Sequence, residues 1–381
     1  MIDRQCGPSR RRWFQYSLRT LLVLVFAVSL ALSWLAVRMQ RARNERLAVE
    51  AIARVGGDSY YNYAYYVEHR GFIGSETPLP AWLRAEESLF GSDLLGLRHV
   101  TEVDLRCDTM FNEIRGTSFT PDQCAAACKS LASFTRLEKL SLSGDRVTDA
   151  CLECLDHLPQ LVWLDLNGTR VTDAGLAHLE RLECLGELDL RDCAVTDAGL
   201  WHLRAYATLR TLDLTRTRIG DRGIELLGRH TALTSLGLSE TAITDAGTRY
   251  LAGLTRLEDL ALCCTAVTDA GLERLNGLQN LHTLSMQQTP IQGAGLKALA
   301  ASPIVELDLN SAQVTDAGLE GVAALKRLSY LDISHTRVTD AGLVCLYALK
   351  GLEHLHISLK RFSAAEIEKL RRTLPNCKID N

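Results

Sequence analysis

The sequence lacks the residue patterns on which most enzymes depend. It contains no glycine-rich phosphate-binding loop and no nucleophile elbow, and its ten histidines are scattered along the chain. His354 and His356 are close in sequence, but no third ligand or nucleophile accompanies them. We therefore predict that the protein is not an enzyme and that it uses no cofactor and no small-molecule substrate.

The body of the chain also lacks a net basic charge. The formal net charge is −4, yet residues 1–46 hold nine arginines against Asp3 and Glu45 and carry +7, which leaves −11 on the remaining 335 residues. Nucleic-acid phosphates require a basic footprint, so an acidic body argues against nucleic acid as a partner. The arginine-rich head is better explained by a membrane.

One uncharged apolar run stands near the start of the chain. Residues 20–37 read TLLVLVFAVSLALSWLAV. At about 1.5 Å per residue this helix would span roughly 27 Å of a bilayer core about 30 Å thick, and Leu18 can extend it. We predict a single-pass membrane protein with a transmembrane helix over residues 18–37 and its body outside the cytoplasm. The alternative is a cleaved signal peptide with its cleavage site near Ala31–Ser33.

The rest of the chain is built from a motif of about 24 residues, repeated some ten times. Each copy has the pattern LxxLxLxxT followed by a relative of Thr-Asp-Ala-Gly-Leu. That five-residue sequence is perfect five times, starting at Thr172, Thr196, Thr268, Thr315 and Thr339. Repeats of this length predict a solenoid, in which each unit buries its apolar face only against its neighbours.

These motifs resemble the leucine-rich repeat, and the TDAGL variant is most similar to its ribonuclease-inhibitor-like and cysteine-containing subclasses. The layout also resembles membrane-anchored repeat proteins of planctomycete bacteria, which share the opening seen at residues 10–22. The resemblance implies an α/β leucine-rich-repeat solenoid, a curved horseshoe with a parallel sheet on its concave face and helices on its convex face. An F-box, found in some relatives, is absent, because the apolar segment occupies its place.

The residues of one repeat support this fold independently. Leu161, Leu164 and Leu166 should point inward from a short strand, and the alternating residues between them should face the concave side. Leu176 should lie on the buried face of the helix that follows. The strand face is therefore where we expect a partner to bind.

The polar and small residues of the repeat have predicted roles as well. Asp173 should cap the helix, Gly175 should allow neighbouring repeats to pack closely, and the Thr169 hydroxyl should satisfy the backbone of the loop. One repeat departs from the pattern: it reads Gln292-Gly-Ala-Gly-Leu, and the next interval is one residue short. We predict a local break in curvature between Gln287 and Ile304.

Four cysteines attract attention by their spacing. Cys124 and Cys128, followed by Cys151 and Cys154, have separations that can suit zinc. Repeat alignment, however, places Cys128 at the core position of Leu152, so we interpret these cysteines as small buried side chains and predict no metal site. A disulfide between two of these cysteines is the alternative if the body lies outside the cytoplasm.

The predicted organisation has six parts. They are a basic tail (1–17), the transmembrane helix (18–37), a helical connector (38–57), an N-terminal cap (58–99), the repeats (100–361) with an inserted loop at 107–118, and a C-terminal cap (362–381).

Eight polar or aromatic residues of the strand face are the predicted partner-binding set. The aspartates would stack across adjacent strands as a docking stripe for a basic segment, or would simply repeat a solvated consensus, and the two aromatic residues would act as anchors. The set comprises Trp163, Asp165, Asp189, Arg191, Asp213, Asp308, Tyr330 and Asp332.

We therefore predict a membrane-anchored scaffold that binds a protein partner, whose identity the sequence does not specify, on its concave face. A structural or adhesive element of the cell envelope is the alternative, and a regulator of an enzyme is a more remote one.

Overall fold

The computed structural model describes residues 18–54, 58–61, 100–105 and 120–380. The chain divides into two compact units, residues 1–47 with 74–97 and residues 48–73 with 98–381, and we describe each by itself. The predicted basic tail, most of the N-terminal cap and the loop at 107–118 lie outside the described residues.

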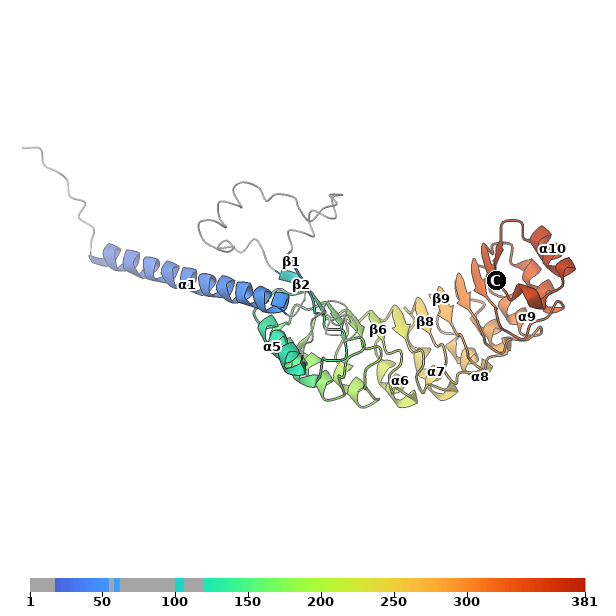
Figure 1. Cartoon of the computed structure of the whole chain (residues 1–381), viewed down its shortest axis with the longest axis horizontal. Helices are drawn as coiled ribbons and strands as arrows, with labels where there is room; N and C mark the ends of the chain where they lie inside the picture. The colour runs from blue at the N-terminus through green and yellow to red at the C-terminus, as the bar shows by residue number, and fades with distance from the viewer. Residues whose placement is uncertain (1–17, 55–57, 62–99, 106–119, 381) are drawn as a thin grey trace, which may run out of the picture. The chain divides into compact units, whose positions relative to one another are not determined.

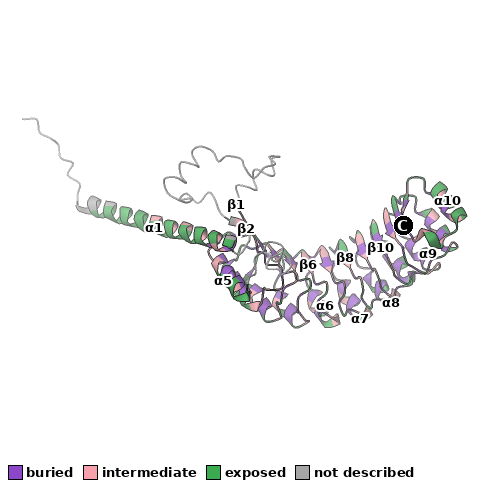
Figure 2. Cartoon of the chain, in the orientation of Figure 1, coloured by how far each residue is buried: buried purple, intermediate pink, exposed green. Residues whose placement is uncertain are grey.

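The described part of the first unit belongs to one helix. Helix α1 (Leu18–Arg54) continues through the predicted apolar segment into the predicted connector. Between residues 22 and 34 its described side chains are exposed, among them Val23, Phe26 and Trp34, whereas Ala48 and Ile52 near its end are buried. Figure 2 shows most of α1 in the green of exposed residues. Within the described ranges, no helix combines the length and apolarity needed to cross a membrane. The transmembrane helix at 18–37 stays a prediction.

The second unit is built on one sheet whose strands follow chain order. Strand β1 (Asp58–Tyr61) pairs antiparallel with β2 (Val100–Asp104), and every later strand pairs in parallel with the one before it. The later strands are β3 (Lys139–Ser141), β4 (Trp163–Asp165), β5 (Glu187–Asp189), β6 (Thr211–Asp213), β7 (Ser235–Gly237), β8 (Asp259–Ala261), β9 (Thr283–Ser285), β10 (Glu306–Asp308), β11 (Tyr330–Asp332), β12 (His354–His356) and β13 (Lys378–Asp380).

From β2 to β13, short helices return the chain from each strand to the next. In Figure 1 they line the convex side of the repeats and the strands line the concave side, as predicted. The α-helices are α5 (Pro121–Leu131), α6 (Asp221–Leu227), α7 (Asp245–Leu251), α8 (Asp269–Leu272), α9 (Leu319–Val322) and α10 (Ala364–Thr373). The 3-10 helices are η1 (Asp149–His157), η2 (Gly175–Arg181), η3 (Gly199–Leu203), η4 (Glu273–Leu275), η5 (Ala294–Leu299), η6 (Gly342–Ala348) and η7 (Leu359–Arg361).

A continuous leucine core fills the space between strands and helices. Leu161, Leu164, Leu166 and Leu176 are fully buried, which confirms the predicted inward positions. Burying one such side chain stabilises the fold by about 1.5–3 kcal/mol, so the repeated leucines supply the main driving force of the solenoid.

A buried threonine closes the loop after the strand in six repeats, as predicted for Thr169, while Cys193 and Ala312 take its place in two others. The Thr241 hydroxyl donates to the Leu238 carbonyl at 2.6 Å, and the Thr265 hydroxyl donates to the Leu262 carbonyl at 2.7 Å. Thr169 itself accepts from the Val171 N–H. An uncompensated carbonyl at these buried positions would be costly, so the hydroxyl is part of the fold.

The repeated aspartate does not cap its own helix, and this prediction was wrong. Asp149 reaches the next repeat instead: its Oδ1 accepts from the Thr172 N–H at 2.8 Å and its Oδ2 accepts from the Thr172 hydroxyl at 2.7 Å. Where a side-chain cap forms within these repeats, threonine supplies it, since Thr244 Oγ1 accepts from the Ala246 N–H at 3.2 Å. A carboxylate that already accepts from two donors in the next repeat is held away from its own helix.

We call this contact the Asp–Thr ladder, and the repeated glycine makes room for it. A Cβ added at Gly175 would lie 2.3 Å from Asp149 Oδ1, which confirms the predicted close packing. The same two hydrogen bonds join Asp173 to Thr196, Asp221 to Thr244, Asp245 to Thr268, and Asp316 to Thr339.

The ladder is interrupted at Gly293, which replaces the aspartate. Strands β9 and β10 pair without a shift there, so the predicted break in curvature does not appear in the sheet register. The irregularity lies in the loop, where Gly293 adopts a left-handed φ of 104° and its backbone approaches the next repeat. A Cβ on Gly318 would lie 1.8 Å from the Gln292 carbonyl oxygen. Backbone atoms here fill the space that a carboxylate fills elsewhere.

Candidate binding surface on the strand face

The strand face carries all eight predicted partner-binding residues, and the parallel register fixes their neighbours. Trp163 on β4 is half-buried and lies between Lys139 on β3 and Glu187 on β5. Adjacent parallel strands are about 4.8 Å apart, so the indole is flanked by one cationic and one anionic side chain. This position provides an aromatic surface with charged neighbours on both sides.

The strand-end aspartates have a structural role that the sequence did not reveal. In each, Oδ1 accepts from the backbone N–H two residues later, at 2.9 Å for Asp165, Asp213 and Asp308 and at 2.7 Å for Asp332. Such contacts stabilise the turn that ends the strand. The repeated aspartates therefore serve the fold, and their second oxygen, Oδ2, is the one directed to other partners.

Arg191 divides the predicted acidic stripe. Its guanidinium donates to both carboxylate oxygens of Asp189, and its Nε lies 3.6 Å from Asp213 Oδ2. The hydrogen bonds to Asp189 raise the pKa of Arg191, so it is cationic at any physiological pH. Asp189 and Asp213 are thus partly neutralised within the chain.

Asp165 is the strand-face aspartate with the clearest electrostatic cost. Burial raises its pKa, and repulsion from Asp189 adds to the increase, while hydrogen bonds from the Asn167 N–H and the Ser141 hydroxyl oppose it. Folding therefore favours the protonated form, and the contribution of Asp165 to stability falls as the pH rises through its pKa. A cationic group from a partner would relieve this cost.

A second cluster lies at the C-terminal end of the strand face, and we call it the Tyr330 patch. It comprises Tyr330, Asp332, His354, His356 and Asp380. The Tyr330 and His356 rings lie 5.4 Å apart at 43° to one another. His356 is paired in register with Asp332 on one side and Asp380 on the other. The patch combines an aromatic pair with two flanking carboxylates.

Charge pairing shapes the edge of this patch. Lys378 Nζ lies 2.7 Å from Asp380 Oδ2, and this contact lowers the pKa of Asp380, with smaller contributions from the two histidines. Burial raises the pKa of Tyr330, so its hydroxyl keeps its proton and can donate a hydrogen bond.

The predicted partner-binding set included Tyr330 and Asp332 but neither His356 nor Asp380. Extending the strand column through Lys378–Asp380 supplies the missing signal, because β13 continues the register that begins at β2. Between Trp163 and the Tyr330 patch, the strand face carries a residue without a side chain, Gly237. The Asp213 carboxylate occupies the space beside it, since an added Cβ would lie 2.3 Å from Asp213 Oδ1. The strand face therefore has two aromatic regions, on β4 and on β11–β12.

Comparison with known proteins agrees with the fold. Five segments match the family described as Leucine Rich repeat, at residues 182–200, 207–228, 277–300, 302–323 and 327–346. No curated protein matches the chain. The chain thus carries leucine-rich repeats at these five segments, within a parallel sheet that continues on both sides of them.

Solved structures show the same architecture at low identity. An internalin from Listeria monocytogenes aligns with a TM-score of 0.51 and 18% identity, over 74% of this chain and 86% of the internalin. A chain from the crystal structure of the mouse RP105/MD-1 complex aligns with a TM-score of 0.52 and 24% identity, over 65% of this chain. That alignment covers only 42% of the mouse chain. Both likenesses concern the fold alone.

Proposed function

We propose that this leucine-rich repeat chain is a non-catalytic protein-interaction module, tethered to a membrane through residues 18–37, whose Tyr330 patch is the main contact with a protein partner. The observation that carries the proposal is the Tyr330–His356 ring pair on an open strand face. Aromatic side chains dominate binding hot spots because they bury a large area at a small entropic cost.

The charges around the two aromatic regions indicate the chemistry of the partner. Asp332 and Asp380 flank His356, and Asp165 stands beside Trp163 in β4. The electrostatic cost at Asp165 falls when a cation approaches, so we propose a partner segment that carries basic groups beside apolar ones. The mouse RP105 structure is itself a complex with MD-1, an example of a protein with this architecture in a protein assembly.

The tether is supported by the composition and exposure of α1. Residues 20–37 carry no charge, and Val23, Phe26 and Trp34 have exposed side chains in the described structure. Moving apolar surface from water into lipid is favourable by about 25 cal/mol per Å². We also propose that the chain belongs to the ribonuclease-inhibitor-like subclass and resembles planctomycete membrane-anchored repeat proteins, on its TDAGL motifs and its opening at residues 10–22.

Site-specific photo-cross-linking in the native membrane tests the function. A photoreactive phenylalanine analogue at Tyr330 should capture a defined protein, and the same analogue at Trp201 should not. Trp201 is a matched control, because it is an exposed aromatic residue on η3 of the convex side. With the captured partner purified, Tyr330→Ala should weaken binding by roughly 30-fold, which corresponds to a hot-spot loss of about 2 kcal/mol.

Two results of this experiment would contradict the proposal. One is capture of the same protein from position 201 but not from 330, and the other is unchanged affinity in Tyr330→Ala with intact folding. Alkaline extraction of the same membranes tests the tether: the full chain should stay with the lipid, and release into the wash would contradict anchoring.

A further inference from the structure

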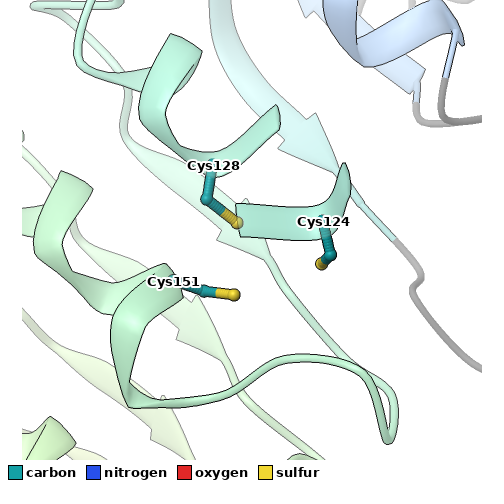
Figure 3. Close-up of side chains that lie close together, drawn as sticks. All are labelled: Cys124, Cys128 and Cys151. Carbon is teal, nitrogen blue, oxygen red and sulfur yellow. The ribbon is translucent and has the colours of Figure 1, made fainter. Parts of the chain in front are cut away.

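Three cysteine thiols meet inside the N-terminal part of the repeat unit. Cys124 and Cys128 lie on α5, and Cys151 lies on η1. Their Sγ atoms all lie within 4.8 Å of one another, and all three residues are fully buried. Figure 3 shows the side chains of the two helices converging on one region. Among the described residues, no other three Cys, His, Asp or Glu ligand atoms form such a group.

The cluster occupies a junction where the Asp–Thr ladder cannot form. Cys151 stands where later repeats have the glycine of TDAGL, such as Gly175. Where Gly175 meets the preceding repeat, the aspartate of that repeat, Asp149, fills the space beside the glycine. At the Cys151 junction, the residue 24 positions before Asp149 is Ala125, so no carboxylate enters. Thiols from α5 take its place. The contact between these two repeats is therefore made by sulfur atoms, where later repeats use a carboxylate that accepts from the backbone N–H.

Ordinary core packing explains this arrangement less well. Cys128 aligns with Leu152 in the next repeat, where a leucine fills the core completely. A hydrophobic core needs one large side chain at that position, and it has no need for three thiols that converge. Cys154, by contrast, is buried in the same helix as Cys151 but donates its thiol to the Cys151 carbonyl at 3.2 Å and is not part of the group.

We propose that Cys124, Cys128 and Cys151 bind one thiophilic closed-shell metal ion, of the class that zinc and copper(I) represent. Soft thiolate ligands select these ions over harder cations. Zinc–sulfur bonds are about 2.3 Å long, so three sulfurs around one ion lie roughly 4 Å apart, within the separation that the structure already provides.

Zinc and copper(I) differ in the buried charge that they would leave at this site and in the number of ligands that they need. Three thiolates carry three negative charges, and a divalent ion leaves less buried charge than a monovalent one. Three ligands are one short of the tetrahedral shell of structural zinc, and this favours copper(I), which accepts fewer sulfurs. Metal content distinguishes the two, and either ion bound at the three thiols is the proposed site.

The burial of the thiols predicts how metal binding depends on pH and on the packing of α5 against η1. Hydrogen bonding to the Cys124 thiol raises the pKa of Cys128 and Cys151, and burial raises both further. A thiol binds a metal ion as the thiolate, so binding releases protons and its affinity increases as the pH rises. Because the cluster is buried, the ion enters as α5 and η1 pack together, and binding stabilises that packing.

The test is the metal content of the full chain, purified in detergent under reducing conditions and refolded with Zn²⁺ alone or Cu⁺ alone. We expect about one ion per chain from at least one of the two. Cys151→Gly should bind less than a tenth of that amount. This variant places the residue of the later repeats at position 151, so it removes a ligand without adding bulk. Cys193→Ser is the matched control, because Cys193 is buried in another repeat and donates to the Leu166 carbonyl.

The result that overturns the proposal is equally defined. It is a wild-type chain that takes up neither ion above the level of an unrelated protein, or a Cys151→Gly chain that keeps the full amount. Circular dichroism checks that each variant is folded. Thiolate ligation is read independently of any variant from a charge-transfer band of the wild-type chain: that of cobalt substituted for zinc where zinc is the ion, or that of copper(I) itself where copper is the ion. Presence of the band supports the site, and its absence in the loaded chain contradicts it.

Discussion

Gly318→Ala should destabilise the repeat unit by about 3 kcal/mol or more, the largest single-methyl effect that we expect in this chain. A Cβ at this position would lie 1.8 Å from the Gln292 carbonyl oxygen and 3.1 Å from the Gly293 Cα. Both are backbone atoms of the preceding repeat, and they cannot rotate away as a side chain would. Relief therefore requires the two repeats to separate, with loss of the leucine packing between them.

Urea unfolding of the repeat unit measures this effect, and Gly351→Ala is its control. At Gly351 the nearest atom to an added Cβ is the Leu328 carbonyl oxygen at 3.8 Å, an ordinary contact. Gly351→Ala should change the free energy of unfolding by less than about 1 kcal/mol. Equal, small effects at the two positions would show that the backbone contact at Gly293 does not constrain the solenoid.

The second large effect concerns the Asp–Thr ladder itself. Gly247→Ala should cost about 1–3 kcal/mol, because its Cβ would lie 2.5 Å from Asp221 Oδ1. Asp221→Ala should cost a similar amount, because the Thr244 N–H and hydroxyl lose their acceptor. In the double variant the new methyl group enters the space that the carboxylate leaves, where the Asp221 Cα is 3.4 Å away.

We therefore expect the double variant to be more stable than the sum of the two single changes, by about 1 kcal/mol or more. A double-mutant cycle in urea measures this coupling directly. Asp221→Ala combined with Gly351→Ala provides the reference, because those residues are far apart in the chain and should be additive. Strict additivity in the Asp221–Gly247 cycle would mean that glycine is required there for another reason.

The periodicity of the sequence was enough to predict the repeated part of the fold. Leu164 and Leu166 are buried because inward and outward positions alternate along a strand, and this rule depends on the sequence alone. Gly175 was placed correctly at a close contact, but the identity of the contacting group was not predicted. Asp149 reaches a residue 23 positions later, and a pattern within one repeat contains no information about that partner.

Conformation and charge pairing were harder to predict. Three residues after the end of each strand from β3 to β11, one residue adopts a left-handed φ. In seven of these repeats it is not glycine, so the usual sequence signal is missing. These residues are Asp192, Arg216, Glu240, Cys264, Gln288, Ser311 and His335. The column of aspartates was visible in the sequence, yet its partial neutralisation by Arg191 depends on a side-chain rotamer. The spacing of the four cysteines stood out in the sequence and their burial was predicted, but burial alone does not say which three thiols converge.

These exceptions to the repeat mark the positions with distinct chemistry. Where the ladder is absent at Ala125, thiols converge, and where it is absent at Gly293, the backbones of two repeats touch. The Tyr330 patch lies beyond the second exception, on strands whose pairing is regular. A binding surface at that end rests on a sheet that the loop irregularity leaves undisturbed.

Hydroxyl-radical footprinting of the full chain, with and without the partner captured from position 330, tests the central claim most directly. Oxidation of Tyr330, His354 and His356 should fall several-fold in the complex, and oxidation of Trp201 on the convex side should not change. Protection of Trp201, with Tyr330 and both histidines oxidised as in the isolated chain, would contradict a partner-binding role for the strand face.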